Sequence, residues 1–296
     1  MSLKKNVPVN RFDKNKAMEN ILLAIDATNI AMPALNFACY LGRLTQSKVT
    51  GIFLERGDTD ERVVSKEMQG RRYFNRQVAE DATQVAEKIN SIEANIAIFR
   101  ETCERKGVQY TIHRDRGVPA VEMIAESRYA DIIVTDAATS FRKVFEGPPT
   151  NFIRDILTDA ECPVIIAPES FEGVDRIIFA YDGSASSVFA MKQFTYLFPR
   201  FEDRNVTVFH VNENRELVED EKRKLAEWLQ NHYAAICFET VAGSACNELF
   251  SYLLLKKNVF IVMGAYGRNS FSQFCKNSHA NILMKTITQP IFIAHH

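Results

Sequence analysis

The segment Asn258-Val-Phe-Ile-Val-Met-Gly264-Ala-Tyr-Gly267 carries the clearest fold signal in this chain, because an apolar run leads directly into a glycine turn. The run is apolar throughout, which is typical of a strand in a parallel sheet that is covered on both faces. A long loop follows and reaches Asn277-Ser278, where a helix-like stretch begins. Glycines let backbone N–H groups approach an anion, and a helix N-terminus adds partial positive charge. The pattern therefore predicts a phosphate-binding loop after a buried strand.

A similar segment occurs earlier in the chain as part of an internal repeat. Four stretches match in the same order: residues 20–26 with 176–182, 49–54 with 206–211, 130–136 with 258–264, and 162–168 with 289–295. Self-similarity of this kind decides the domain count. We therefore predict two copies of one domain, residues 17–169 and 174–295, joined near residues 168–174.

Within each copy, short apolar runs alternate with stretches of helical period. In the second copy we expect strands at 176–181, 205–211, 234–241, 259–263 and 290–294, and helices at 185–198, 215–231, 245–257 and 278–287. This alternation predicts an α/β protein of two tandem, doubly wound domains, each with a parallel five-stranded sheet. The first copy adds a helical pattern from about residue 73 to residue 106, which must outrun the sheet it covers. Its overhang could pack on the other domain or on a partner, or it could be solvated.

Composition excludes several classes of protein. The 296 residues are 46% hydrophobic and 25% charged, with a net charge of -1, so neither a nucleic acid nor a membrane surface is favoured as a partner. No apolar run is long enough to span a bilayer. The six cysteines are scattered without metal-ligand spacing, which favours reduced thiols in a cytoplasmic protein and no metal site.

The ends of the predicted strands hold the candidate binding residues. In doubly wound sheets, ligands bind beyond the carboxyl ends of strands, where the strand order reverses. Asp182-Gly183-Ser184 closes the first strand of the second copy, and Val211 ends the second strand. A turn followed by a helix N-cap would explain Asp182 and Ser184 equally well.

The long loop also carries polar groups that suit a phosphate. Arg268 and His279 are cationic donors, and Asn277 offers a side-chain amide. A solvated basic loop is the alternative explanation for these cations. His210 lies on an apolar strand and is expected to be a core histidine, whereas residues 113–116 are expected to form a surface charge cluster.

The whole chain resembles a tandem universal stress protein. Asp182-Gly183-Ser184, Val211 and the stretch Met263–Arg268, with Asn277-Ser278 and the closing residues 289–293, are similar to that family's strand ends and its G-x2-G-x9-G-S/T signature. The resemblance implies the universal-stress-protein fold, related to adenine nucleotide α-hydrolase-like proteins. It also implies one ATP, with Mg²⁺, in the C-terminal domain. Adenine and ribose would lie at Asp182 and Val211, and the triphosphate at Gly264, Gly267 and Ser278. The sequence departs from the signature at Asn277, where a side chain would crowd the approach of the phosphates.

The first copy departs much further from the signature. Asp136 replaces the first glycine and would repel phosphate, and Pro149 has no N–H to donate. Asp26 is retained, but Ala27-Thr28 follows it. We expect that this domain binds no triphosphate. It either binds an uncharged or cationic ligand or serves as a structural half.

The resemblance implies a cytoplasmic stress-response protein that binds ATP for regulation, with no catalytic or metal-ligating residues assigned. The two copies are expected to pair through residues 162–167 and 290–294 as a pseudo-dimer within the chain, and two chains could form a homodimer. The alternatives are a nucleotide-free interaction or scaffold protein of the same fold and a slow ATP hydrolase. No general base is evident beside the loop.

Overall fold

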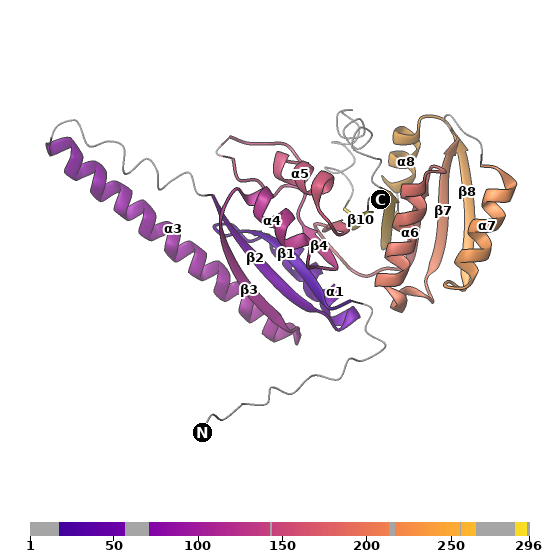
Figure 1. Ribbon diagram of the computed structural model, residues 1–296, viewed down its shortest axis with the longest axis horizontal. Helices are drawn as coiled ribbons and strands as arrows, with labels where there is room; N and C mark the ends of the chain where they lie inside the picture. The colour runs from indigo at the N-terminus through magenta and orange to yellow at the C-terminus, as the bar shows by residue number, and fades with distance from the viewer. Residues whose placement is uncertain are drawn as a thin grey trace, which may run out of the picture.

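A computed structural model describes residues 18–56, 71–142, 144–212, 217–254, 256–264 and 288–294. Within them, ten strands form one sheet in the order β3-β2-β1-β4-β5-β10-β9-β6-β7-β8 (Figure 1). The strands are β1 (Asn20–Asp26), β2 (Lys48–Arg56), β3 (Tyr110–Gly117), β4 (Ile132–Thr135), β5 (Val164–Ile166), β6 (Arg176–Tyr181), β7 (Asn205–Asn212), β8 (Ala235–Ala242), β9 (Val259–Gly264) and β10 (Ile291–Ala294). All pairs inside each half of the sheet are parallel.

Helices cover both faces of the sheet, as expected of a doubly wound fold. The described helices are α1 (Met32–Thr45), α3 (Arg71–Lys106), α4 (Pro119–Ser127), α5 (Asn151–Asp159), α6 (Ala185–Leu197), α7 (Glu219–Gln230) and α8 (Ala245–Leu254), with a short 3-10 helix η2 (Pro199–Phe201). Side chains of α1, α3, α6 and α7 form one buried cluster with the sheet, and side chains of α4, α5 and α8 form the other. The predicted fold class is confirmed.

Burial along the strands explains why some of them read as uninterrupted apolar runs. β4, β9 and β10 are buried at every position, because helices cover both sides of the central strands. The outer strands β3 and β8 instead mix half-buried and exposed positions. The charged segment 113–116 thus falls on an edge of the sheet, where polar side chains can reach water.

The predicted element boundaries hold with two corrections. The strands differ from the predictions by at most one residue at either end, and the long helix is α3. The helix expected at 215–231 begins at Glu219, where three acidic residues occupy the first turn and suit the positive end of its dipole. The helix expected at 245–257 ends at Leu254. The helix expected at 278–287 lies outside the described residues.

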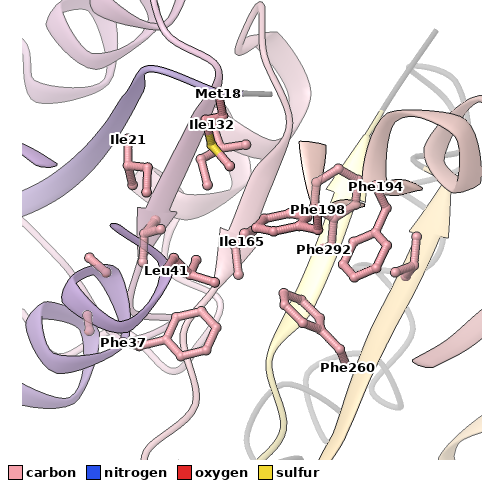
Figure 2. Close-up of a cluster of buried hydrophobic side chains, with 14 of the residues drawn as sticks. Met18, Ile21, Phe37, Leu41, Ile132, Ile165, Phe194, Phe198, Phe260 and Phe292 are labelled. Carbon is pink, nitrogen blue, oxygen red and sulfur yellow. The ribbon is translucent and has the colours of Figure 1, made fainter. Parts of the chain in front are cut away.

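The two halves join through their last strands. β5 and β10 are antiparallel, with Ile166 opposite Ile291 and Val164 opposite Ile293. The predicted pairing inside the chain is therefore present. Figure 2 shows Ile165 and Phe292 at this junction, with Phe194 and Phe198 close to Phe292. The Phe292 ring centroid is 5.4 Å from that of Phe194, so helix α6 and the junction share one aromatic cluster.

Helix α3 extends beyond the sheet and points away from the second half (Figure 1). Of the three alternatives for its overhang, packing on the other domain is therefore excluded for the described part. In the described residues, no helix is both long enough and apolar enough to cross a membrane. Nor do those residues bring three or more metal-ligating side chains together.

Candidate functional site

The candidate site lies at the carboxyl ends of β6, β7 and β9 in the second half. β6 has β7 on one side and β9 on the other, so the strand order reverses at β6. This is the position at which open α/β sheets bind ligands. The structure brings the ends of the three strands, and with them Asp182, Val211 and Gly264, to the same edge of the sheet.

Asp182-Gly183-Ser184 forms a tight turn from β6 into α6. The Ser184 N–H donates to Asp182 Oδ1 at 2.9 Å, and Gly183 has φ 79°, a conformation that favours glycine. Ser184 is the N-cap of α6, because its Oγ accepts from the Ser187 N–H at 3.1 Å. The turn-and-cap role foreseen for this segment is confirmed, and it fixes the N-terminus of α6 beside the strand ends.

Gly264 is pressed against the first turn of α6. A Cβ at this position would lie 2.5 Å from the carbonyl carbon of Ser186 and 2.6 Å from the amide nitrogen of Ser187. Sequence reasoning assigned this glycine to the approach of an anion and missed its packing role. The only signal was the position of Gly264 at the end of a buried strand, next to a strand that leads into a helix. Because the residue has no side chain, the end of β9 and the N-terminus of α6 can lie in direct contact.

His210 connects the ends of β6 and β7. Its Nδ1 lies 2.9 Å from the carbonyl oxygen of Tyr181, and its side chain is 2% exposed. The histidine is thus a hydrogen-bonded core residue, as predicted. Val211, the next residue, is half-buried and packs against the second hydrophobic cluster. It therefore forms part of the apolar surface at the end of the strand.

The remaining predicted site residues lie outside the described part of the chain. These are Gly267, Arg268, Asn277, Ser278 and His279, all within residues 265–287. Their role in a phosphate-binding loop stays a prediction.

The corresponding edge of the first half also contains a hydrogen-bonded turn, at the end of β1. Asp26 Oδ1 accepts from the Thr28 N–H at 2.9 Å and from Thr28 Oγ1 at 2.8 Å. Burial raises the pKa of Asp26, and the hydrogen bonds from Thr28 and the charge of Lys88 offset part of that effect. The aspartate thus holds its own turn, as Asp182 does in the second half.

Helix α3 covers the end of β1. Asn95 Nδ2 donates to the carbonyl oxygen of Ala27 at 3.0 Å, and Ser91 Oγ donates to that of Thr28 at 3.2 Å. Ile92 and Ile96, on the same helix, are buried in the core. Sequence reasoning missed this contact. The spacing of Ser91 and Asn95, one helical turn apart beside buried isoleucines, was the signal available.

The loop after β4 is also internally bonded. Asp136 Oδ1 accepts from the Ala138 N–H at 3.1 Å, and Thr150 Oγ1 donates to the carbonyl oxygen of Thr139 at 2.5 Å. Thr150 is the N-cap of α5, and Pro149 precedes it. One backbone N–H and one carbonyl group of the loop are thus bonded to its own side chains.

The charged residues on β3 form ion pairs with neighbouring elements. Arg114 Nη2 lies 2.9 Å from Glu55 Oε1, and Arg114 Nη1 lies 3.0 Å from Glu93 Oε1 on α3. Arg116 Nε lies 3.6 Å from Glu55 Oε2. Because Glu55 is 6% exposed, these arginines neutralise a buried carboxylate. The predicted charge cluster therefore ties α3 and β2 to the edge strand.

No protein-family model and no curated protein matches this sequence. Solved structures do match the fold over nearly the whole chain. A universal stress protein from Archaeoglobus fulgidus DSM 4304 is 17% identical with a TM-score of 0.61, covering 93% of this chain and 98% of its own. A protein of unknown function from Pseudomonas aeruginosa PAO1 is 14% identical with a TM-score of 0.60, covering 95% and 93%.

The molecule is thus a doubly wound α/β protein whose candidate binding edge lies at the carboxyl ends of β6, β7 and β9. Its fold is that of the universal stress proteins, with two such halves in one chain.

Proposed function

We propose that this chain is a cytoplasmic universal stress protein whose C-terminal half binds one ATP for regulation. The observation that carries the proposal is the meeting of Asp182, Val211 and Gly264 at neighbouring strand ends, where the strand order reverses. Asp182 and Val211 would hold the adenine and ribose. Gly264 and the capped N-terminus of α6 would border the phosphates, which favour a helix N-terminus.

The triphosphate would be held by the predicted loop residues Gly267, Arg268, Asn277, Ser278 and His279, and Mg²⁺ would neutralise part of its charge. The proposed action is linked to binding rather than to catalysis. A nucleotide that binds only the folded state stabilises that state by mass action, and it favours whichever conformation binds it better. His210 is bonded to Tyr181 in the core, which supports structure rather than proton transfer for this histidine.

The first half is proposed to bind no nucleotide. In support, Asn95 and Ser91 of α3 donate hydrogen bonds to the carbonyl groups of Ala27 and Thr28, which follow β1. Asp136 also takes the position that corresponds to Gly264 in the second half. The carboxylate would repel phosphate, and displacing α3 would expose buried isoleucines. One ATP per chain is the expected stoichiometry.

Isothermal titration of Mg·ATP into the purified full chain tests the proposal. We expect one site with a dissociation constant below about 1 mM, and its loss in Gly267→Asp, which puts a carboxylate into the phosphate loop. Asp136→Gly is the matched variant for the first half and should leave the stoichiometry at one. Absence of binding by the wild type would reject the ATP proposal. Two sites per chain would reject the proposal that the first half binds no nucleotide. Phosphate release in the same samples measures any slow hydrolysis.

A nucleotide-free interaction protein is the second candidate function. Val85 and Ile89 lie one turn apart on α3 and are 47% and 46% exposed, an arrangement suited to an apolar contact with another protein chain. Self-association is the form of this candidate that can be tested directly. If two chains associate through this turn, the wild type should sediment as a dimer in a sedimentation-velocity experiment. The double variant Val85→Lys/Ile89→Lys should then have the smaller sedimentation coefficient of a monomer. Identical monomers in both samples would reject that dimer.

A further inference from the structure

Cys39 of α1 and Cys103 of α3 face each other in the core of the first half. Their Sγ atoms are 3.8 Å apart, and both side chains are 0% exposed. Sixty-four residues separate them along the chain, so this contact results from the packing of α3 on α1. Cys162 and Cys237, the other cysteines with described side chains, are free as well.

The distance between the two sulfurs is short enough for a disulfide after a small movement. A disulfide bond is about 2.05 Å long, so the sulfurs need to approach each other by less than about 2 Å.

The two thiols are chemically unequal. The hydrogen bond from Cys103 lowers the pKa of Cys39, and the positive charge of Lys106 lowers it further against the effect of burial. The shared hydrogen bond and burial raise the pKa of Cys103. These directions favour Cys39 as the thiol that attacks an oxidant, with Cys103 attacking second.

A pocket borders the turns that carry both thiols. It has a volume of about 560 Å³, and its lining includes Asn36 and Arg43, about one turn before and after Cys39, and Lys106, one turn after Cys103. A peroxide as small as a water molecule needs only a local opening of these helix turns to reach the sulfurs. Bulky reagents should be excluded.

We propose that Cys39 and Cys103 form a peroxide-sensitive dithiol that closes to a reversible disulfide between α1 and α3. The Cys39 thiolate attacks one oxygen of hydrogen peroxide and the O–O bond breaks, which yields Cys39 sulfenic acid and hydroxide. The hydroxide takes up the proton that Cys39 released on ionisation and becomes water. Cys103 then attacks the Cys39 sulfur, the S–O bond breaks, and water leaves after taking up the Cys103 proton. Peroxide is reduced to two waters and the two thiols are oxidised to one disulfide. A dithiol reductant reverses the step.

The disulfide would fix the C-terminal part of α3 to a helix that also supports the junction between the halves. Phe37 of α1 lies 6.1 Å from Phe260 of β9, measured between ring centroids (Figure 2). Cross-linking residues so distant in sequence restricts the unfolded chain, so the oxidised protein should unfold at a higher temperature. The inference is independent of ATP binding.

Peroxide treatment of the full chain, followed by alkylation and peptide mapping without reduction, tests this inference. We expect a linked peptide containing Cys39 and Cys103, and a rise in melting temperature of about 5 °C that dithiothreitol reverses. Cys162→Ser, which alters another buried thiol, should behave like the wild type. Cys103→Ser should lose the linked peptide and the temperature shift.

The outcome that would overturn the proposal is a wild-type map in which Cys39 and Cys103 stay unlinked while the exposed Cys237 is oxidised. A link from Cys39 to another cysteine would also overturn it. The map uses the wild-type protein, so the result does not depend on the folding of a variant. Iodoacetamide labelling before oxidation should modify Cys237 ahead of the buried pair.

Discussion

Gly264 and Ser186 are in contact through their backbones, with no room between them for even one side-chain carbon. We predict that Gly264→Ala lowers the free energy of unfolding by about 1–3 kcal/mol, because the new methyl group forces β9 and α6 apart. Urea denaturation measures this loss. Gly107→Ala is the control: its φ is 66°, but nothing lies within 4 Å of the added carbon, so it adds backbone strain without a clash. A smaller effect at Gly264 than at Gly107 would contradict the prediction.

Asp26→Asn should change the pH dependence of stability. Because burial raises the pKa of Asp26, the folded protein binds this proton more tightly than the unfolded chain does. Stability from this group is therefore present below the unfolded pKa and is lost as the pH rises through the folded pKa. Asparagine retains an acceptor for Thr28 and carries no charge. We expect the variant to be more stable than the wild type at pH 7 and to lose that advantage below about pH 4.

The control for this variant is Asp136→Asn in the same half, which also retains an acceptor for its own turn. Thermal unfolding from pH 3 to pH 8 gives the stability of each variant and of the wild type as a function of pH. Parallel curves for Asp26→Asn and the wild type would show that the buried charge has no influence on stability.

Substitutions at Ser184 separate its capping role from nucleotide binding. Ser184→Ala should lower the free energy of unfolding by about 1 kcal/mol, because the Ser187 N–H loses its acceptor. Ser184→Asp retains an N-cap acceptor and should restore most of that loss. The added carboxylate would lie beside the proposed phosphates, so we expect at least a tenfold weaker affinity for ATP.

Thr150→Asp makes the matched change at the N-cap of α5 in the first half and should leave ATP affinity unchanged. Urea denaturation gives the free energy of unfolding of each variant, and isothermal titration on the same preparations gives its affinity for ATP. Equal ATP affinity in Ser184→Asp and the wild type would place the nucleotide elsewhere.

Phe292→Ala should weaken the junction between the halves. The ring is 0% exposed and lies among the aromatic side chains of α6 (Figure 2), so its removal leaves a cavity that costs about 3–5 kcal/mol. Circular dichroism during urea denaturation should show the loss, and the single transition should broaden or split if the halves unfold separately. Leu254→Ala, at a side chain that is 50% exposed, should cost far less.

The backbone arrangement of this protein was largely predictable because its signals are local or periodic. Uninterrupted apolar runs identified β4, β9 and β10, and their recurrence in order identified the two halves and their pairing strands. The start of α7 and the end of α8 were less accurate, because helix boundaries carry weaker signals than the periodic interior of a helix.

The contacts between distant side chains were not predictable. The one-turn spacing of Ser91 and Asn95 indicates a polar contact but not its partner, the carbonyl oxygen of Ala27. Nothing local to Cys39 indicates Cys103. Gly264 could be selected as a site residue from its position, but its contact with Ser186 follows from how a separate helix is placed. The partner in each of these contacts is set by the packed fold and not by a local pattern in the sequence.

The pairing of β5 with β10 has a consequence for how the chain is made. β5 ends at Ile166 and its partner begins at Ile291, so a ribosome must synthesise the entire second half before that edge of the first half can be covered. During this interval an apolar strand with unpaired N–H and C=O groups is exposed to other nascent chains. The yield of native protein is therefore expected to depend on synthesis speed and on chaperone capture as well as on the final stability.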